Sequence, residues 1–136
     1  MKIDILASLN ELDKVYTHLA SNLPEDAIVF LHGDLASGKT TLTSYIAQQK
    51  GLGSASSPTF ALQNSYDDQL FHYDLYRIED DEFMNMGLFE EFEKSGWHMI
   101  EWGSENLQKL LSSAGYDITT IEITPRQNQR KYSIQR

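Results

Sequence analysis

Apolar and polar positions along the chain change period several times, and each change marks a predicted element. Residues 2–7 alternate as a short strand does, and residues 8–11 (Ser-Leu-Asn-Glu) then have the capping-box pattern that begins a helix. The run Ala27-Ile28-Val29-Phe30-Leu31 is continuously apolar, which is typical of a strand buried on both faces. A helical pattern extends from Lys39 to about Lys50 and ends at Gly51, where a residue without Cβ can adopt the left-handed cap.

The second half of the chain combines a strand pair with short helical segments and two closing strands. Residues 60–66 and 69–76 resemble strands on either side of the turn Asp67-Asp68, so we expect an antiparallel hairpin. The remaining predicted elements are helical segments at 80–86, 88–94 and 105–114 and strands at 97–102, 116–123 and 131–135. No repeat, low-complexity tract or linker divides the sequence. Residues 1–136 are therefore predicted to form a single α/β domain, with a mixed sheet flanked by helices.

Composition limits where the chain works and what stabilises it. Its 136 residues are 40% apolar, which is enough to bury one core. The longest purely apolar run, 27–31, is far shorter than the roughly 20 residues of a membrane-spanning helix, and Met1-Lys2-Ile3-Asp4 begins no signal peptide. The absence of cysteine excludes disulfides, thiolate metal sites and cysteine nucleophiles. We expect a soluble, cytoplasmic protein with no membrane contact.

The charge of the chain is negative and unevenly distributed. A net charge of −9 argues against an independent grip on nucleic acid, because affinity for a phosphate backbone comes largely from basic side chains. Residues 67–93 hold ten acids and the single base Arg77, whereas the C-terminus is basic. The acidic segment is either a docking surface for a basic partner or a solvated helix face.

Residues 33–40, Gly-Asp-Leu-Ala-Ser-Gly-Lys-Thr, have the spacing of a phosphate-binding loop and lie between the buried strand and the next helix. Lys39 is expected to reach the β and γ phosphates, and the Thr40 hydroxyl is expected to bind Mg²⁺. A ligand-free glycine and serine turn is the alternative. The sequence predicts a P-loop NTPase fold that binds ATP and Mg²⁺. Its predicted nucleotide-binding residues here are Gly33, Asp34, Leu35, Ala36, Ser37, Gly38, Lys39, Thr40 and Thr41.

Two acids end predicted strands and are candidates for the metal site. Asp74 ends the segment Leu-Phe-His-Tyr-Asp, and Glu101 ends the strand that begins at Trp97. Strand ends on one edge of an open α/β sheet converge, so either carboxylate can join the Mg²⁺ shell or orient water. Without the glycine loop, both would be read as ordinary strand-end acids. Trp102 is more typical of a core position, and the four histidines lack metal-cluster spacing, so we assign them no role.

Thr59 lies in the Ser57-Pro58-Thr59-Phe60 segment after the glycine-loop helix, where P-loop proteins place a γ-phosphate sensor. Pro58 restricts the backbone on both sides and aims Thr59 reproducibly, although a plain serine and proline turn is the alternative. Three functions remain open: a partner-coupled ATPase, a small-molecule kinase and a nucleotide-dependent binding module that does not hydrolyse ATP. Kinases usually have arginines in a mobile lid, and Arg77 is the only arginine before residue 126.

Four motifs together resemble the TsaE family, the small ATPases of bacterial tRNA threonylcarbamoyladenosine (t⁶A) biosynthesis. They are the glycine loop at 33–41, Ser-Pro-Thr-Phe at 57–60, His-Tyr-Asp-Leu-Tyr-Arg at 72–77 and Ile-Glu-Trp at 100–102, in the order and approximate spacing of that family. The resemblance covers residues 1 to about 134. It departs from the family at Ala36-Ser37, where the family usually has Gly-Ala; the loss of glycine restricts the backbone at position 36.

The resemblance implies roles for individual residues. It implies that Lys39 and Thr40 bind phosphate and Mg²⁺, that Asp74 is the Walker B carboxylate and that Glu101 joins the metal site. It further implies a switch role for Thr59 and a nucleotide contact from Arg130. The implied partners are a Gcp/Kae1-like threonylcarbamoyl transferase subunit and its paralogous dimer mate, with tRNA reached only through that complex. The implied activity is hydrolysis of Mg-ATP, coupled to the transferase.

Overall fold

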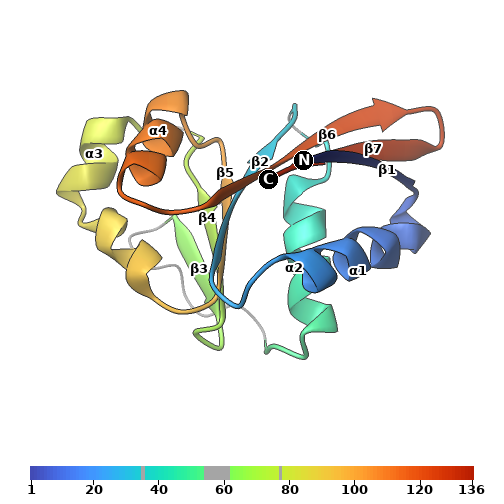
Figure 1. Cartoon of the computed structure of the whole chain (residues 1–136), viewed down its shortest axis with the longest axis horizontal. Helices are drawn as coiled ribbons and strands as arrows, with labels where there is room; N and C mark the ends of the chain where they lie inside the picture. Colours follow the sequence, from blue (N-terminus) through green and yellow to red (C-terminus); the bar gives the residue numbers. More distant parts are fainter. Residues whose placement is uncertain (35, 54–61, 77) are drawn as a thin grey trace.

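The computed structural model describes residues 1–34, 36–53, 62–76 and 78–136. Within them, seven strands form one sheet in the order β1-β7-β6-β2-β5-β4-β3 (Figure 1). Strands β6, β2, β5 and β4 are mutually parallel, while β7 and β3 join this group in antiparallel orientation and β1 pairs antiparallel with β7. The mixed sheet was predicted. The strands are β1 Lys2–Ala7, β2 Ala27–His32, β3 Gln63–Tyr66, β4 Leu70–Asp74, β5 Trp97–Glu101, β6 Ile118–Arg126 and β7 Gln129–Gln135.

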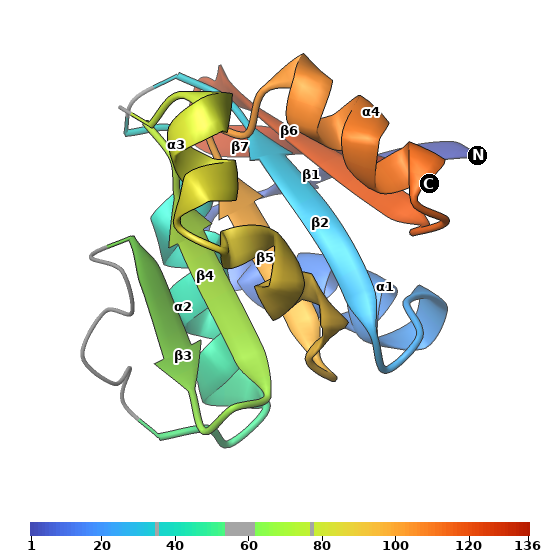
Figure 2. The same cartoon turned by 90° about the vertical axis from the view of Figure 1, so that its left-hand side faces the viewer.

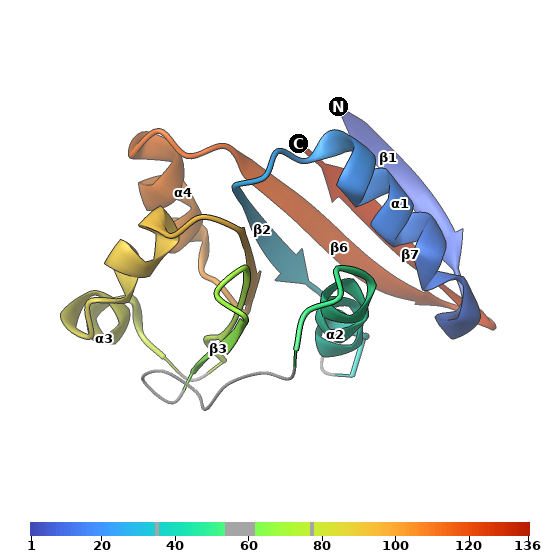
Figure 3. The same ribbon diagram turned by 90° about the horizontal axis from the view of Figure 1, so that it is seen from below.

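Helices cover both faces of the sheet (Figures 1 and 3). One face carries α1 (Leu12–Asn22) and α2 (Lys39–Gln49), and the other carries α3 (Asp80–Asn85), the 3₁₀ helix η2 (Leu88–Glu93) and α4 (Glu105–Ser113). In β2, Val29 and Leu31 belong to the first core, and Ile28 and Phe30 belong to the second. Successive side chains of a strand point to opposite faces, so this double burial explains the continuous apolar run.

The order of the central strands determines which residues meet at the upper edge of the sheet (Figure 2). Strands β2, β5 and β4 are parallel and adjacent, so their C-terminal ends share one edge. Register places Leu31 beside Glu101 and Glu101 beside Asp74. The segment that leaves β2 enters the glycine loop and then α2. Ligand sites of open α/β sheets form at this kind of edge.

Turn chemistry explains where the predicted hairpin closes. Asp67 and Asp68 have φ of 51° and 52°, so both central residues of the turn adopt the left-handed conformation, and the Gln69 N–H donates to the Tyr66 carbonyl oxygen at 3.0 Å to close it. Aspartate tolerates this conformation better than most residues. Strands β3 and β4 pair antiparallel on either side, as predicted, although the predicted residues 60 and 61 lie outside the described part of the chain.

Two of the predicted helical segments contain 3₁₀ helices. The helical segment predicted at 88–94 is present as a 3₁₀ helix at residues 88–93, and Gly87, with φ of 74°, separates it from α3. The 3₁₀ helix η1 (Leu9–Glu11) precedes α1, so Leu9 points away from the buried face and is 58% exposed. No helix in the described ranges has the length and apolar character needed to cross a membrane.

Candidate nucleotide site

Close packing of backbone shapes the glycine loop at the end of β2. Gly33 has φ of 151°, and a Cβ there would lie 2.9 Å from the carbonyl oxygen of Ile123 in β6. Gly38 has φ of 109° and directly precedes α2, and a Cβ on it would collide with the Arg130 guanidinium. Both positions therefore need glycine for the conformation as well as for the space. The loop therefore packs closely against β6 at Gly33 and against the Arg130 side chain of β7 at Gly38.

Lys39 folds back over the loop that precedes it. Its Nζ donates to the carbonyl oxygens of Gly33 at 2.6 Å and Asp34 at 3.2 Å, and it lies 4.0 Å from the centre of the Trp102 ring. The residue is only 4% exposed, which is rare for lysine without a carboxylate partner. The ammonium group is thus held at the mouth of the loop, where the predicted phosphate would lie.

Ala36 adopts a conformation that normally needs glycine. Its φ is 63°, in the left-handed region, where a Cβ clashes with the following backbone. This is the position at which the sequence departs from the family pattern. Ala36 therefore carries local backbone strain that a glycine at this position would not carry.

Glu101 contacts the start of α2 directly. Thr40 Oγ1 donates to Glu101 Oε2 at 2.8 Å, and His72 Nε2 contacts the same oxygen. Burial alone would raise the pKa of the Glu101 carboxyl, but hydrogen bonds from His72 and Thr40 outweigh it and hold the pKa below its ordinary value. Glu101 is therefore a buried, ionised carboxylate beside the predicted magnesium ligand.

Asp74 lies beside Glu101 but makes different contacts. It is exposed, and its Oδ1 accepts a hydrogen bond from the backbone N–H of Tyr76 at 3.1 Å. Strand β5 lies between β2 and β4, so Asp74 is one strand farther from the glycine loop than Glu101. In this geometry Thr40 contacts Glu101, whereas Asp74 lines the same cavity as an exposed residue. The predicted metal role of Asp74 stays a prediction.

One cavity of about 390 Å³ collects most of the predicted site residues. Within the described ranges, Ser37 Oγ and Arg130 Nη1 are buried atoms without a hydrogen-bond partner. Buried polar atoms are rarely left unsatisfied, so two of them at one glycine loop point to a missing acceptor such as phosphate oxygen. The cavity is lined by Ala36, Ser37, Gly38, Lys39, Thr40, Thr41, Asp74, Tyr76, Glu101, Trp102 and Arg130.

Some predicted residues cannot be placed, and some site residues were missed. Leu35 and Thr59 lie outside the described residues. Trp102, which the sequence made more typical of a core position, lines the cavity, and its φ of 60° marks the irregular backbone after β5. His72 received no role from the sequence, yet it contacts Glu101. Two sequence signals pointed to His72: it is a polar residue inside an otherwise buried strand, and it begins the motif at 72–77.

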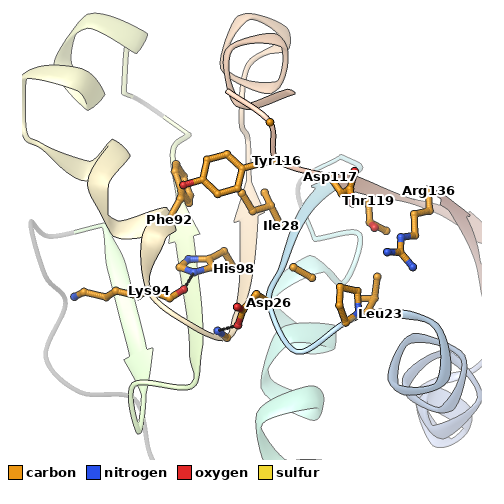
Figure 4. Close-up of a pocket in the computed structure, with 14 residues that line it drawn as sticks. Leu23, Asp26, Ile28, Phe92, Lys94, His98, Tyr116, Asp117, Thr119 and Arg136 are labelled. Carbon is orange, nitrogen blue, oxygen red and sulfur yellow. Dashed lines mark hydrogen bonds between the residues drawn. The ribbon is translucent and has the colours of Figure 1, made fainter. Parts of the chain in front are cut away.

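A second hollow, of about 160 Å³, lies at the opposite edge of the sheet (Figure 4). Two of its polar side chains, Asp26 and His98, are already hydrogen-bonded within the protein. Asp26 Oδ1 accepts from Ser95 at 2.6 Å and from the Gly96 N–H at 3.0 Å. His98 lies between the Tyr73 hydroxyl, at 2.7 Å, and the Lys94 carbonyl, at 2.8 Å. These contacts satisfy Asp26 Oδ1 and both ring nitrogens of His98, so neither residue calls for a ligand.

Comparison with known proteins agrees with the geometry. The family model described as "Threonylcarbamoyl adenosine biosynthesis protein TsaE" matches residues 6–132. The chain belongs to the TsaE family. Proteins named "tRNA threonylcarbamoyladenosine biosynthesis protein TsaE" are similar to it along the chain. The one from Bacillus subtilis is 37% identical over 109 residues, covering 71% of this chain and 68% of the relative. The one from Nostoc is 33% identical over 147 residues, covering 92% and 90%.

Other matches span less of the relative or show only the fold. The TsaE protein from Haemophilus influenzae is 40% identical over 92 residues, which are 64% of this chain and 58% of that protein. A solved structure, described as the crystal structure of Bacillus subtilis YdiB, superposes with a TM-score of 0.65 at 20% sequence identity. That match covers 98% of this chain and 84% of the other, and it supports the single-domain α/β P-loop fold of the TsaE family.

Proposed function

We propose that this TsaE-family chain binds and hydrolyses Mg-ATP, and that hydrolysis is coupled to a threonylcarbamoyl-transferase complex that makes t⁶A in tRNA. The observation that carries the proposal is the cavity in which Lys39, Thr40, Glu101 and Arg130 meet around the glycine loop. The names of the relatives, which refer to tRNA threonylcarbamoyladenosine biosynthesis, support the biological setting.

The cavity provides positive charge and free donors for phosphate. An ammonium group has three N–H donors, and Lys39 uses two of them on loop carbonyls, which leaves one for a phosphate oxygen. Arg130 Nη1 and Ser37 Oγ lack partners among the described residues. The N-terminus of α2 adds backbone N–H groups and the positive end of its dipole. A triphosphate satisfies all of these groups at once.

Magnesium fits the oxygen ligands at the same place. Mg²⁺ prefers one or two carboxylates together with substrate phosphates, and Thr40, Glu101 and Asp74 offer a hydroxyl and two carboxylates on the cavity wall. The described residues contain no group of three histidine, cysteine, aspartate or glutamate side chains that could hold a metal by themselves. This favours an ion that arrives with the nucleotide. When bound, Mg²⁺ would neutralise phosphate charge.

Glu101 is the residue that best fits the orientation of water for hydrolysis. Its carboxylate is ionised because hydrogen bonds overcome the effect of burial on its pKa, and its position at the cavity lets it accept a hydrogen bond from water. Arg130 is well placed to stabilise charge on the transferring phosphoryl group. Strand β7 pairs with β1 on one side and β6 on the other, so the sheet holds the backbone that carries Arg130.

Arg130 also suggests where the nucleoside lies. It lines the cavity of the glycine loop and a neighbouring hollow of about 280 Å³ between β1, η1 and the β6–β7 turn. We propose that the phosphates occupy the first and the adenosine extends past Arg130 into the second. Polar side chains of the turn, such as Gln127 and Asn128, are suited to hydrogen bonding with ribose or base.

Titration calorimetry with ATP and Mg²⁺ tests the site. Lys39→Ala should abolish detectable binding, because the ammonium neutralises phosphate charge, while the melting temperature changes little. Lys109→Ala is the matched control, since Lys109 is exposed on α4 and should leave the affinity unchanged. Affinity in Lys39→Ala equal to that of the wild type would contradict the site.

The reaction is tested by measuring phosphate release and product formation. We expect slow release of phosphate by the isolated protein and faster release with the two candidate transferase subunits and tRNA. A small-molecule kinase would instead need an added acceptor and would yield a phosphorylated product. Phosphate release in the absence of any acceptor therefore separates these two functions, and nucleotide binding without release would indicate a binding module.

A further inference from the structure

His72 is a buried polar residue on a strand that otherwise contributes apolar side chains to the core. It lies on β4 and is 6% exposed. Its register partner Met99 and its same-face neighbour Leu70 are completely buried apolar residues of the core beneath α1 and α2. An apolar side chain at position 72 would fit this pattern and avoid the cost of burying an imidazole. The histidine must therefore be explained by its contact.

Its contact is with the carboxylate at the centre of the proposed site. His72 Nε2 lies against Glu101 Oε2, the oxygen that also accepts the Thr40 hydroxyl at 2.8 Å. An ionised carboxylate only accepts hydrogen bonds, so we assign the proton to Nε2 of His72. The other oxygen, Oε1, has no hydrogen bond among the described residues, and Glu101 lines the cavity. One oxygen is thus anchored and the other is available.

We infer that His72 is a positioning residue that fixes the Glu101 carboxylate for the hydrolysis of ATP, an inference that rests on the proposed function. The Thr40 hydroxyl donates to Glu101 in this structure, but it is also the predicted magnesium ligand and would bind Mg²⁺ once Mg-ATP is present. The imidazole of His72 is buried, contacts the carboxylate and has no other hydrogen bond in the described part of the chain. His72 therefore holds Glu101 in one rotamer while the Thr40 hydroxyl binds Mg²⁺. A carboxylate that orients water loses much of its effect when its position varies by about 1 Å.

Replacement of His72 separates positioning from folding. In His72→Leu, the turnover number for ATP should fall by about tenfold or more while the Kd for Mg-ATP changes less than about threefold. In His72→Gln, a side-chain N–H of similar reach should restore turnover to within about threefold of the wild type. His98→Leu is the matched control: His98 is equally buried but bonds Tyr73 and the Lys94 carbonyl on the opposite face. It should lower the melting temperature and leave the turnover number of the folded protein unchanged.

A double-mutant cycle decides whether His72 acts through Glu101. In a Glu101→Gln background, His72→Leu should reduce turnover by less than about twofold further, because the group that it positions is already lost. An undiminished loss in that background overturns the inference, and so does wild-type turnover in His72→Leu. If His72→Leu does not fold, the comparison of His72→Gln with the shorter His72→Asn gives the same decision, since only glutamine should retain turnover.

These outcomes are distinct from failure of the proposed function. Absence of ATP binding and turnover in the wild-type protein would overturn the function and this inference together. Normal wild-type turnover that is insensitive to every His72 variant would overturn the inference alone. Imidazole nitrogen NMR of the nucleotide-free protein supplies a readout independent of activity: the Nε2–H signal of His72 should shift in Glu101→Gln, and an unchanged signal would contradict the contact.

Discussion

Ala36 occupies a left-handed backbone conformation with φ of 63°, and this single residue carries strain that a glycine would relieve. The left-handed region costs a residue with Cβ about 1–2 kcal/mol, and glycine avoids this cost. Part of the gain in stability is lost, because glycine also raises the conformational entropy of the unfolded chain. We expect Ala36→Gly to stabilise the protein by about 0.5–1 kcal/mol in urea denaturation. Ala114→Gly is the control, because Ala114 has φ of −79° and glycine there should destabilise. Equal effects of both substitutions would contradict strain at Ala36.

The Glu101 side chain accepts hydrogen bonds and carries a negative charge, and replacement by glutamine removes only the charge. In Glu101→Gln, an amide oxygen can still accept the hydrogen bonds of Thr40 and His72, so the local packing should persist. We expect Mg-ATP affinity to stay within about tenfold, since water can replace one lost ligand, while hydrolysis falls far more. Calorimetry and steady-state phosphate release measure the two quantities. Hydrolysis at the wild-type rate would remove Glu101 from the mechanism.

Trp102 should report on the nucleotide because its ring faces the ammonium group of Lys39 at 4.0 Å. A phosphate that draws Lys39 away changes this cation–π contact, and with it the surroundings of the indole. In a Trp97→Phe background, which leaves Trp102 as the sole tryptophan, Mg-ATP should change the fluorescence. The same titration in Lys39→Ala is the control and should give no change. A constant signal in the first protein would place Trp102 outside the nucleotide site.

At the scale of elements, local patterns in the sequence predict what each segment forms, and sheet order determines what it meets. The glycine loop was predicted correctly between β2 and α2, because the turn and the start of the helix each need particular residue types at nearby positions. The contact between His72 and Glu101 was missed because it depends on β5 inserting beside β4, a pairing between distant segments. The roles proposed for Lys39, Thr40 and Asp74 came from spacing and resemblance. How far each of these three residues lies from Glu101 could be determined only from the folded structure.

The start of α1 should weaken in acid. Glu11 accepts hydrogen bonds from Lys14 at 2.7 Å and from the Ser8 N–H at 3.0 Å, and these contacts lower its pKa from 4.5 to about 2. A depressed folded-state pKa stabilises the protein fully above the unfolded value, so this contribution is present above pH 4.5 and is lost as the pH falls toward about 2.

NMR titration of the Glu11 carboxyl should therefore give a midpoint near 2, and Lys14→Ala should raise it because the largest cause of the shift is removed. In melting experiments between pH 5 and pH 2, Glu11→Gln should flatten part of the decline in stability on this limb. Glu25→Gln is the control, because Glu25 has no hydrogen bond in the described residues. A Glu11 midpoint near 4.5 would show that the capping contacts are absent in solution.

At the scale of the whole molecule, negative charge gathers on the side of the sheet that carries α3 and η2. Glu82 and Glu90 are exposed there, and neither forms an ion pair within the described part of the chain. Unpaired surface acids are free to meet a basic partner, which speeds association at low salt. Asp80 is a poor target for mutation because its Oδ1 accepts the Ser104 hydroxyl at 2.7 Å and links α3 to α4.

We expect this acidic side, residues 79–93, to dock the transferase complex, so reversal of Glu82 and Glu90 to lysine should weaken partner stimulation of ATP hydrolysis. Nucleotide affinity should hardly change, because neither residue lines the cavity. Reversal of Asp13 and Glu25, two exposed acids outside residues 79–93, changes the net charge equally and serves as the control. The rate is measured against partner concentration at two salt concentrations, since screening reduces the attraction between exposed charges. If this side docks the partner, higher salt should weaken the stimulation of the wild-type protein. The variant with Glu82 and Glu90 reversed should also be stimulated less than the control variant. Fast hydrolysis by the isolated protein, or stimulation indifferent to both the reversal and the salt, would exclude electrostatic docking through this side.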